Sequence, residues 1–112
     1  MIHVLAIITT KPGQREAALR AFKANVPAVH AEEGCIEYQA VVDVDGADPA
    51  FGPDTFVVVE KWESLTALKA HAAAPHMAAY GQKTRDLVAK RAVHVLTSPE
   101  QARQDGKGEA GI

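Results

Sequence analysis

The sequence VVVEKWESLTALKAHAAAPH, from Val57 to His76, passes from an apolar run into an alanine-rich run. The β-branched residues at its start favour a strand, and Ser64 is a good N-cap for a helix that begins one residue later. Pro75 should end or bend that helix, because proline cannot donate the hydrogen bond that a helix interior requires. We therefore predict a strand over residues 55–62 and a helix over residues 65–73, followed by a second helical piece.

The rest of the chain alternates between the same two kinds of element. An apolar run that stops at Lys11-Pro12-Gly13 predicts a strand over residues 2–10. Apolar residues at spacings of three and four then predict an amphipathic helix from Gln14, with Gly34 as its C-terminal cap. Further strands are predicted over residues 35–44 and 92–97, and a loop rich in turn formers over residues 45–54. The order β-α-β-β-α-β indicates an α+β, ferredoxin-like fold with one antiparallel four-stranded sheet.

Length and composition indicate one ordinary globular domain. The chain has 112 residues, of which 47% are hydrophobic and 23% charged, and its net charge is -2. We expect a domain over residues 1–97 and a polar tail over residues 98–112, disordered in isolation, that can dock on a partner subunit. Without a basic block, nucleic acid is not an expected partner. The single cysteine and the short first apolar run predict a soluble cytoplasmic protein, with no signal peptide and no membrane span.

The strands are apolar on both faces, although the helices can cover only one of them. An apolar sheet face left in water usually marks an interface, so we predict a homodimer that packs sheet to sheet. The alternative is that the tail or the 45–54 loop covers this face. The opposed apolar residues are Ile2, Val4, Ala6 and Ile8 against Leu5 and Ile7, Phe56 and Val58 against Val57 and Val59, and Val93 and Val95 against Ala92 and Leu96.

Several polar and aromatic residues converge on the face where strand and helix meet. Their combination resembles a small-ligand site, where apolar walls carry a few polar groups. Each also has a structural interpretation, as a core tryptophan, a hydrogen-bonded histidine, a helix cap or a partner of a helix N–H. The second strand should turn Ile36, Tyr38, Ala40 and Val42 to one face. The candidate site residues are Tyr38, Glu60, Trp62, His71, His76 and Tyr80.

Other kinds of site have little support in the sequence. His71 and His76 are five residues apart, which places them on different faces of a regular helix, so we expect no metal site. Phosphate-binding glycine loops and the GxSxG elbow of serine hydrolases are absent. The run His30-Ala31-Glu32-Glu33 is interpreted as a solvated helix end.

Two segments resemble a known family. FVVVEKWESLTALKAHAAAPHM resembles the E-x-W…H…PH signature of antibiotic biosynthesis monooxygenase domains, a group that includes small quinol monooxygenases. EEGCIEY, at residues 32–38, resembles the family's turn into the second strand, and the likeness runs from Ile2 to about Thr97. The resemblance implies a dimeric α/β barrel. It also implies oxidation of a small electron-rich aromatic, such as a quinol or an anthrone, by O₂ without metal, haem or flavin.

The same resemblance implies roles for the candidate residues. His71 matches the helix histidine and would be the base or proton relay, and Trp62 would be a slot wall and N–H donor. Tyr38, His76 and Tyr80 would orient the ring, while Glu60 would position a neighbour. The first strand lacks the asparagine of relatives that degrade haem, and the 45–54 loop looks long for the family. The alternatives are a non-catalytic ligand-binding or stress-associated barrel and, less favoured, an isomerase.

Overall fold

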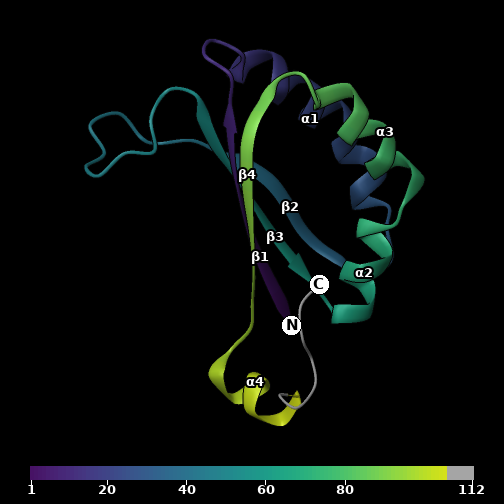
Figure 1. Cartoon of the computed structure of the whole chain (residues 1–112). Helices are drawn as coiled ribbons and strands as arrows, with labels where there is room; N and C mark the ends of the chain where they lie inside the picture. Colours follow the sequence, from purple (N-terminus) through teal and green to yellow (C-terminus); the bar gives the residue numbers. More distant parts are fainter. Residues whose placement is uncertain (106–112) are drawn as a thin grey trace.

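The computed structural model describes residues 1–105 and confirms the ferredoxin-like fold. Helices α1, α2 and α3 lie on one side of the sheet, and α4 lies beyond the end of β4 (Figure 1). The elements in chain order are β1 (Ile2–Thr10), α1 (Arg15–His30), β2 (Cys35–Val41), β3 (Thr55–Trp62), α2 (Leu65–Ala72), α3 (Pro75–Thr84), β4 (Val88–Leu96) and α4 (Pro99–Asp105).

The sheet has the strand order β2-β3-β1-β4, and every neighbouring pair is antiparallel. Its register places Tyr38, Glu60, Val4 and Val95 in one row across the four strands. Directly paired residues turn their side chains to the same face. Since Tyr38, Glu60 and Val4 are buried, this row lies on the face that the helices cover.

The limits of two strands differ from the predicted ones. The strand β2 stops at Val41 because the Asp43 carboxylate accepts hydrogen bonds from the backbone of the returning loop, at Phe51 and Gly52. The strand β4 begins earlier, at Val88, because the long β1 pairs with it as far as Thr10.

The beginning of the predicted tail is also ordered. Residues 99–105 form α4, and the Ser98 hydroxyl caps that helix by accepting from the Gln101 N–H at 3.1 Å. The rest of the tail, residues 106–112, lies outside the described residues, and its docking on a partner stays a prediction. Within residues 1–105, no helix is both long and apolar enough to span a membrane.

A bulge changes the predicted face of one residue in β2. The register shifts between Cys35 and Glu37, so Cys35 pairs with Trp62 and packs against the core. Ile36, predicted to share the face of Tyr38, is instead 49% exposed. A bulge places two residues of one strand opposite one of its partner, which breaks the simple alternation that we assumed.

The helix-covered face is filled, and the opposite face is open. Trp62, Phe56, Val4 and Val29 are the largest fully buried side chains of the core. On the outer face Leu5 of β1 is 38% exposed and Leu96 of β4 is 46% exposed. The strand β4 is exposed on both of its faces from residue 89 to residue 96. The strands therefore carry apolar residues on both faces, as predicted. The homodimer inferred from this pattern stays a prediction.

Candidate functional site

The helix that carries His71 is held close to the turn between α1 and β2. Ser64 caps α2 by accepting from the Ala67 N–H at 3.1 Å. Gly34 in the turn has a φ of +84°, and a Cβ atom there would lie 2.6 Å from the Cβ of Ala67. Only glycine permits both this backbone conformation and this close approach. The contact brings the acidic end of α1 beside the ends of α2 and α3.

Glu32 joins the two histidines of the predicted site. Its carboxylate lies 3.0 and 3.1 Å from Nδ1 of His71, and one of its oxygens lies 2.6 Å from Nε2 of His76. The side chains of Glu32, His71 and His76 are 14%, 6% and 30% exposed. The prediction that Glu32 belongs to a solvated helix end is therefore wrong. The histidines also do not diverge, because the break before Pro75 turns α3 relative to α2.

The geometry around His71 favours one tautomer of its ring. An ionised carboxylate can only accept hydrogen bonds, so Nδ1 of His71 carries a proton when it faces Glu32. Nε2 has no hydrogen-bond partner among residues 1–105. Within residues 1–105, every side-chain nitrogen or oxygen that is fully buried has a hydrogen-bond partner. Since Nε2 of His71 has none, this atom must be accessible from outside the core. In the neutral ring, Nε2 therefore offers a lone pair, as a general base requires.

Aromatic side chains surround the His71 ring. The Trp62 ring centroid lies 4.6 Å from it, and that of Tyr38 lies 5.5 Å away. Tyr38 stacks on Phe22 at 4.9 Å, and Tyr80 meets Phe22 edge-on at 6.4 Å. The structure thus brings four of the predicted site residues into one cluster, namely Tyr38, Trp62, His71 and Tyr80. Phe22 of α1 belongs to the same cluster, although it was not among the predicted site residues.

Glu60 is buried and has its own partner. The Trp62 indole N–H donates to Oε1 of Glu60 at 2.9 Å, so this donor is already engaged. Burial raises the pKa of the Glu60 carboxyl, while the Trp62 hydrogen bond and the charge of His71 oppose that shift. Burial is also the main cause that raises the pKa of the Tyr38 and Tyr80 phenols, so both keep their protons near neutral pH.

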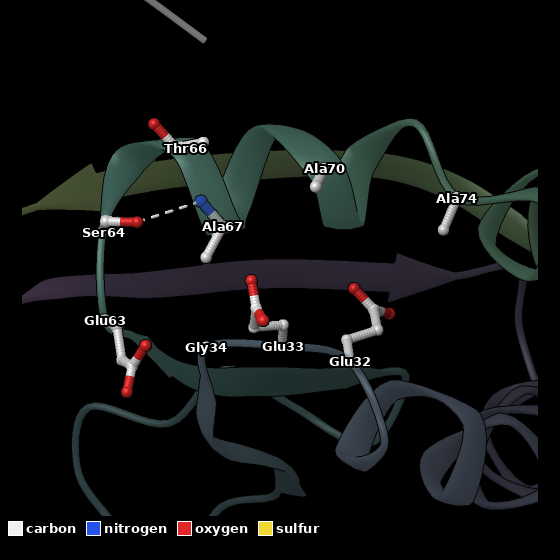
Figure 2. A pocket seen from close by; sticks show the side chains of 9 residues that line it. All are labelled: Glu32, Glu33, Gly34, Glu63, Ser64, Thr66, Ala67, Ala70 and Ala74. Atoms are coloured by element: carbon white, nitrogen blue, oxygen red, sulfur yellow. Dashed lines mark hydrogen bonds between the residues drawn. The ribbon is translucent and has the colours of Figure 1, made fainter.

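The described hollows do not include the space beside the indole that the family resemblance led us to expect. The larger, of about 290 Å³, lies between α2 and the turn at Gly34 (Figure 2). Neither this hollow nor a smaller one of about 110 Å³ is lined by Trp62 or His71. Glu32 borders the larger hollow, and its other lining residues are Glu33, Gly34, Glu63, Ser64, Thr66, Ala67, Ala70 and Ala74.

The helix-covered face of the sheet is open along β4. Val95 and Val93 pair with the buried Val4 and Ala6 of β1, so their side chains point to the helix-covered face. Both are nevertheless exposed, at 38% and 48%. The helices therefore leave this edge of the face uncovered. Among residues 1–105, no group of three or more His, Cys, Asp or Glu side chains is arranged to hold a metal ion.

Comparison with known proteins identifies relatives over most of the chain. The family model described as "Antibiotic biosynthesis monooxygenase" matches residues 1–83. The Escherichia coli K12 protein "Probable quinol monooxygenase YgiN" is 39% identical over 100 residues, covering 86% of this chain and 96% of that protein. PA3566 from Pseudomonas aeruginosa has a TM-score of 0.74 at 26% identity, covering 87% and 92% of the two chains.

A second solved structure gives the same result. Rv0793 from Mycobacterium tuberculosis has a TM-score of 0.73 at 28% identity, covering 87% of this chain and 93% of that one. The family model spans well over half of the sequence, and the fold agrees with that of the solved relatives. The chain belongs to the antibiotic biosynthesis monooxygenase family.

Proposed function

We propose that this protein is a cofactor-independent monooxygenase that oxidises a small electron-rich aromatic, such as a quinol, with O₂. The observation that carries the proposal is the pairing of His71 with Glu32 inside a cluster of aromatic rings. The name of the 39% identical relative, "Probable quinol monooxygenase YgiN", supports the same class of substrate. A fold of this type hosts many activities, so the proposed activity is inferred from the residues of the site and not from the fold.

His71 would begin the reaction as a general base. Its Nε2 accepts the proton of a ring hydroxyl as the O–H bond breaks, and the Glu32 carboxylate stabilises the imidazolium that forms. The resulting anion is rich enough in electrons to reduce O₂ directly. For a quinol the balance is quinol plus O₂ to hydroxyquinone plus water. One oxygen atom enters the ring, the other leaves as water, and the ring supplies both electron pairs.

The substrate would lie against the uncovered helix side of β4. Val93 and Val95 offer an apolar floor there, and the protonated phenol of Tyr80 is a donor close enough to β4 for the charge of Arg91 to act on it. Tyr38 is buried on β2, at the other edge of the sheet, and would serve as a wall deeper in the cluster. The developing anion is stabilised best by hydrogen-bond donors when water is excluded. Trp62 would be a wall, because its N–H already donates to Glu60.

A homodimer would supply the exclusion of water. The apolar outer face of the sheet and the exposed strand β4 are surfaces that a second copy can cover by packing sheet to sheet. Two such sheets would form the dimeric α/β barrel that the family resemblance implies. The partner in this proposal is therefore another copy of the chain, and the ligands are O₂ and the aromatic substrate.

Oxygen uptake tests the proposal. Purified, metal-stripped protein should consume O₂ with menadiol or a dihydroxyanthracene faster than buffer does. His71→Gln should lower kcat/KM by about 10²–10⁴-fold, because the general base is lost. Lys69→Gln, at an exposed position of the same helix and outside both the cluster and the outer sheet face, is the control and should keep the rate.

Two outcomes would reject the oxygenase. Uptake at the uncatalysed rate over a broad panel of quinols would reject it directly. Tight binding of these ligands without turnover would favour the alternative function, a non-catalytic ligand-binding barrel. Equal losses in the His71 and Lys69 variants would remove His71 from the mechanism, even if the activity exists.

A further inference from the structure

We propose that Glu32 and His76 are positioning residues that set the protonation and orientation of His71. The inference has a physical part, the effect of Glu32 and His76 on the His71 ring, which rests on the geometry alone. Its catalytic part, the effect on the reaction, rests on the proposed function. His71 and His76 come from different helices, and both place a ring nitrogen on the same carboxylate. His76 was predicted to orient the substrate, yet its Nε2 is turned to Glu32 at 2.6 Å.

Glu32 acts on His71 in two ways. By accepting from Nδ1 it keeps the lone pair of the neutral ring on Nε2, which is the nitrogen that would face the substrate. Its negative charge also favours the imidazolium that exists after proton transfer. A carboxylate that holds a catalytic imidazole in this manner contributes without touching the substrate, so Glu32 is a positioning residue.

His76 keeps that carboxylate in place. Glu32 borders the hollow of Figure 2, so its side chain has open space on one side. The hollow also carries Glu33 and Glu63, whose charges would repel a third carboxylate that turned toward them. The His76 N–H opposes such a movement, because it binds Oε2 of Glu32, one of the two oxygens that face His71.

Other titratable groups also face this cluster. Glu60 from β3 interacts electrostatically with both His71 and Glu32, and burial raises its pKa. Tyr38 and Cys35 from β2 interact with Glu32, and Tyr80 from α3 interacts with Tyr38. The two phenols and the thiol have pKa values raised by burial, so they remain neutral near pH 7. The groups that can carry charge around His71 are therefore Glu32, Glu60 and His76, and the charge of Arg91 from β4 acts on Glu60.

The physical part is tested without substrate, by NMR of the histidine ring nitrogens, which reports the tautomer of a neutral ring. Glu32→Gln can turn its amide NH₂ group toward Nδ1, so the neutral His71 ring should lose its Nδ1–H tautomer in favour of the Nε2–H form. Glu33→Gln removes the same charge from the neighbouring, exposed position and is the matched control. It should leave the His71 tautomer unchanged, because Glu33 does not contact the ring. The same His71 tautomer in both variants would overturn the inference.

The role of His76 is tested by two substitutions. His76→Gln keeps an N–H donor near the position of Nε2, whereas His76→Leu keeps the bulk and removes the donor. We expect His76→Leu to lower kcat about 10-fold with KM nearly unchanged, and His76→Gln to recover most of that loss. Similar losses in both variants would assign His76 to packing or to substrate contact, and would overturn its positioning role.

The kinetics of Glu32→Gln link the two parts. This variant should lower kcat with KM nearly unchanged, because its His71 ring no longer holds a lone pair on Nε2. A tautomer that changes as expected in a protein without oxygenase activity would sustain the positioning geometry while rejecting the proposed function. A Glu32→Gln variant that keeps the wild-type kcat would reject the positioning role alone.

Discussion

Glu32 and Glu60 interact with the same histidine but have different surroundings. Glu32 is bound by two imidazoles and borders a hollow, whereas Glu60 has the single indole N–H of Trp62 and is 7% exposed. Burial therefore raises the pKa of Glu60. Carboxylates in such different surroundings can take different roles in acid–base chemistry, and this arrangement gives Glu32 the role of the anion beside His71.

The raised pKa of Glu60 predicts how stability depends on pH. The folded protein holds this proton more tightly than the unfolded chain, so the stabilisation is fully present below the ordinary pKa of 4.5 and is lost as pH rises through the folded value. Glu60→Gln keeps an acceptor for Trp62 and has no charge to bury. Its free energy of unfolding at pH 7 should exceed that of the wild type, by about 1.4 kcal/mol per unit of raised pKa.

Urea unfolding between pH 4 and pH 8 provides the measurement. The difference between the two proteins should grow with pH and then level off. A constant difference over this range would contradict the assignment of a raised pKa to Glu60. Glu33→Gln, at an exposed position, should show little change and controls for the loss of a surface charge.

The sequence predicted which residues belong to the site more readily than it predicted which of them contact each other. Tyr38, Trp62, His71 and Tyr80 were expected together because strand and helix periodicity places them on one face. Glu32 could not be found in this way, because its contacts with the histidines span 39 and 44 residues and depend on how α1 ends. The sequence offered one signal for Glu32. Two acids, Glu32 and Glu33, directly precede Gly34, where the chain must turn sharply.

At the scale of elements, the packing of α2 against the turn at Gly34 determines where His71 lies. Gly34→Ala should destabilise the protein for two reasons, since its φ of +84° disfavours a side chain and the new Cβ would meet Ala67. Gly46→Ala has a φ of +82° with nothing within 4 Å, so it isolates the first effect. We expect a loss of roughly 1–2 kcal/mol for Gly46→Ala and about 1–3 kcal/mol more for Gly34→Ala.

Thermal or urea unfolding measures both losses. Equal values for the two variants would show that the turn and α2 can separate without cost. The NMR signals of His71 should shift in Gly34→Ala and stay in place in Gly46→Ala, because only the first substitution pushes α2 away from Glu32.

The elements themselves were predicted unevenly. The strands β1 and β3 have the predicted limits, because β-branched runs bounded by turn residues define both. The end of β2 depends on hydrogen bonds from the returning loop to Asp43, and the start of β4 depends on the length of β1 beside it. Neither cause can be seen in the local sequence of the strand. The bulge at Cys35 likewise depends on pairing with β3.

At the scale of the whole molecule, the outer face of the sheet is an apolar surface that no helix among residues 1–105 covers. Leu5 lies at its centre, on β1, between Val59 of β3 and His94 of β4. In the proposed dimer, Leu5→Glu would bury a carboxylate in an apolar interface, which is costly without a partner. We expect the light-scattering mass to fall from that of two chains to that of one at micromolar concentration.

Val44→Glu is the matched control for that experiment. Val44 is 75% exposed in the loop between β2 and β3, which projects away from the sheet (Figure 1). Its variant should keep the mass of two chains. A wild-type mass equal to one chain would reject the dimer, and circular dichroism would establish that both variants remain folded.

The separation between α2 and α3 has a consequence for the order of folding. The turn after α1 and the two short helices each need only local interactions to form, but the cluster of Glu32 with both histidines requires all three to have docked. Contacts between distant parts of a chain carry a large loop-closure cost and tend to form late. The chemically competent arrangement should thus appear in a refolding chain only after α2 and α3 have formed and docked beside the turn that follows α1.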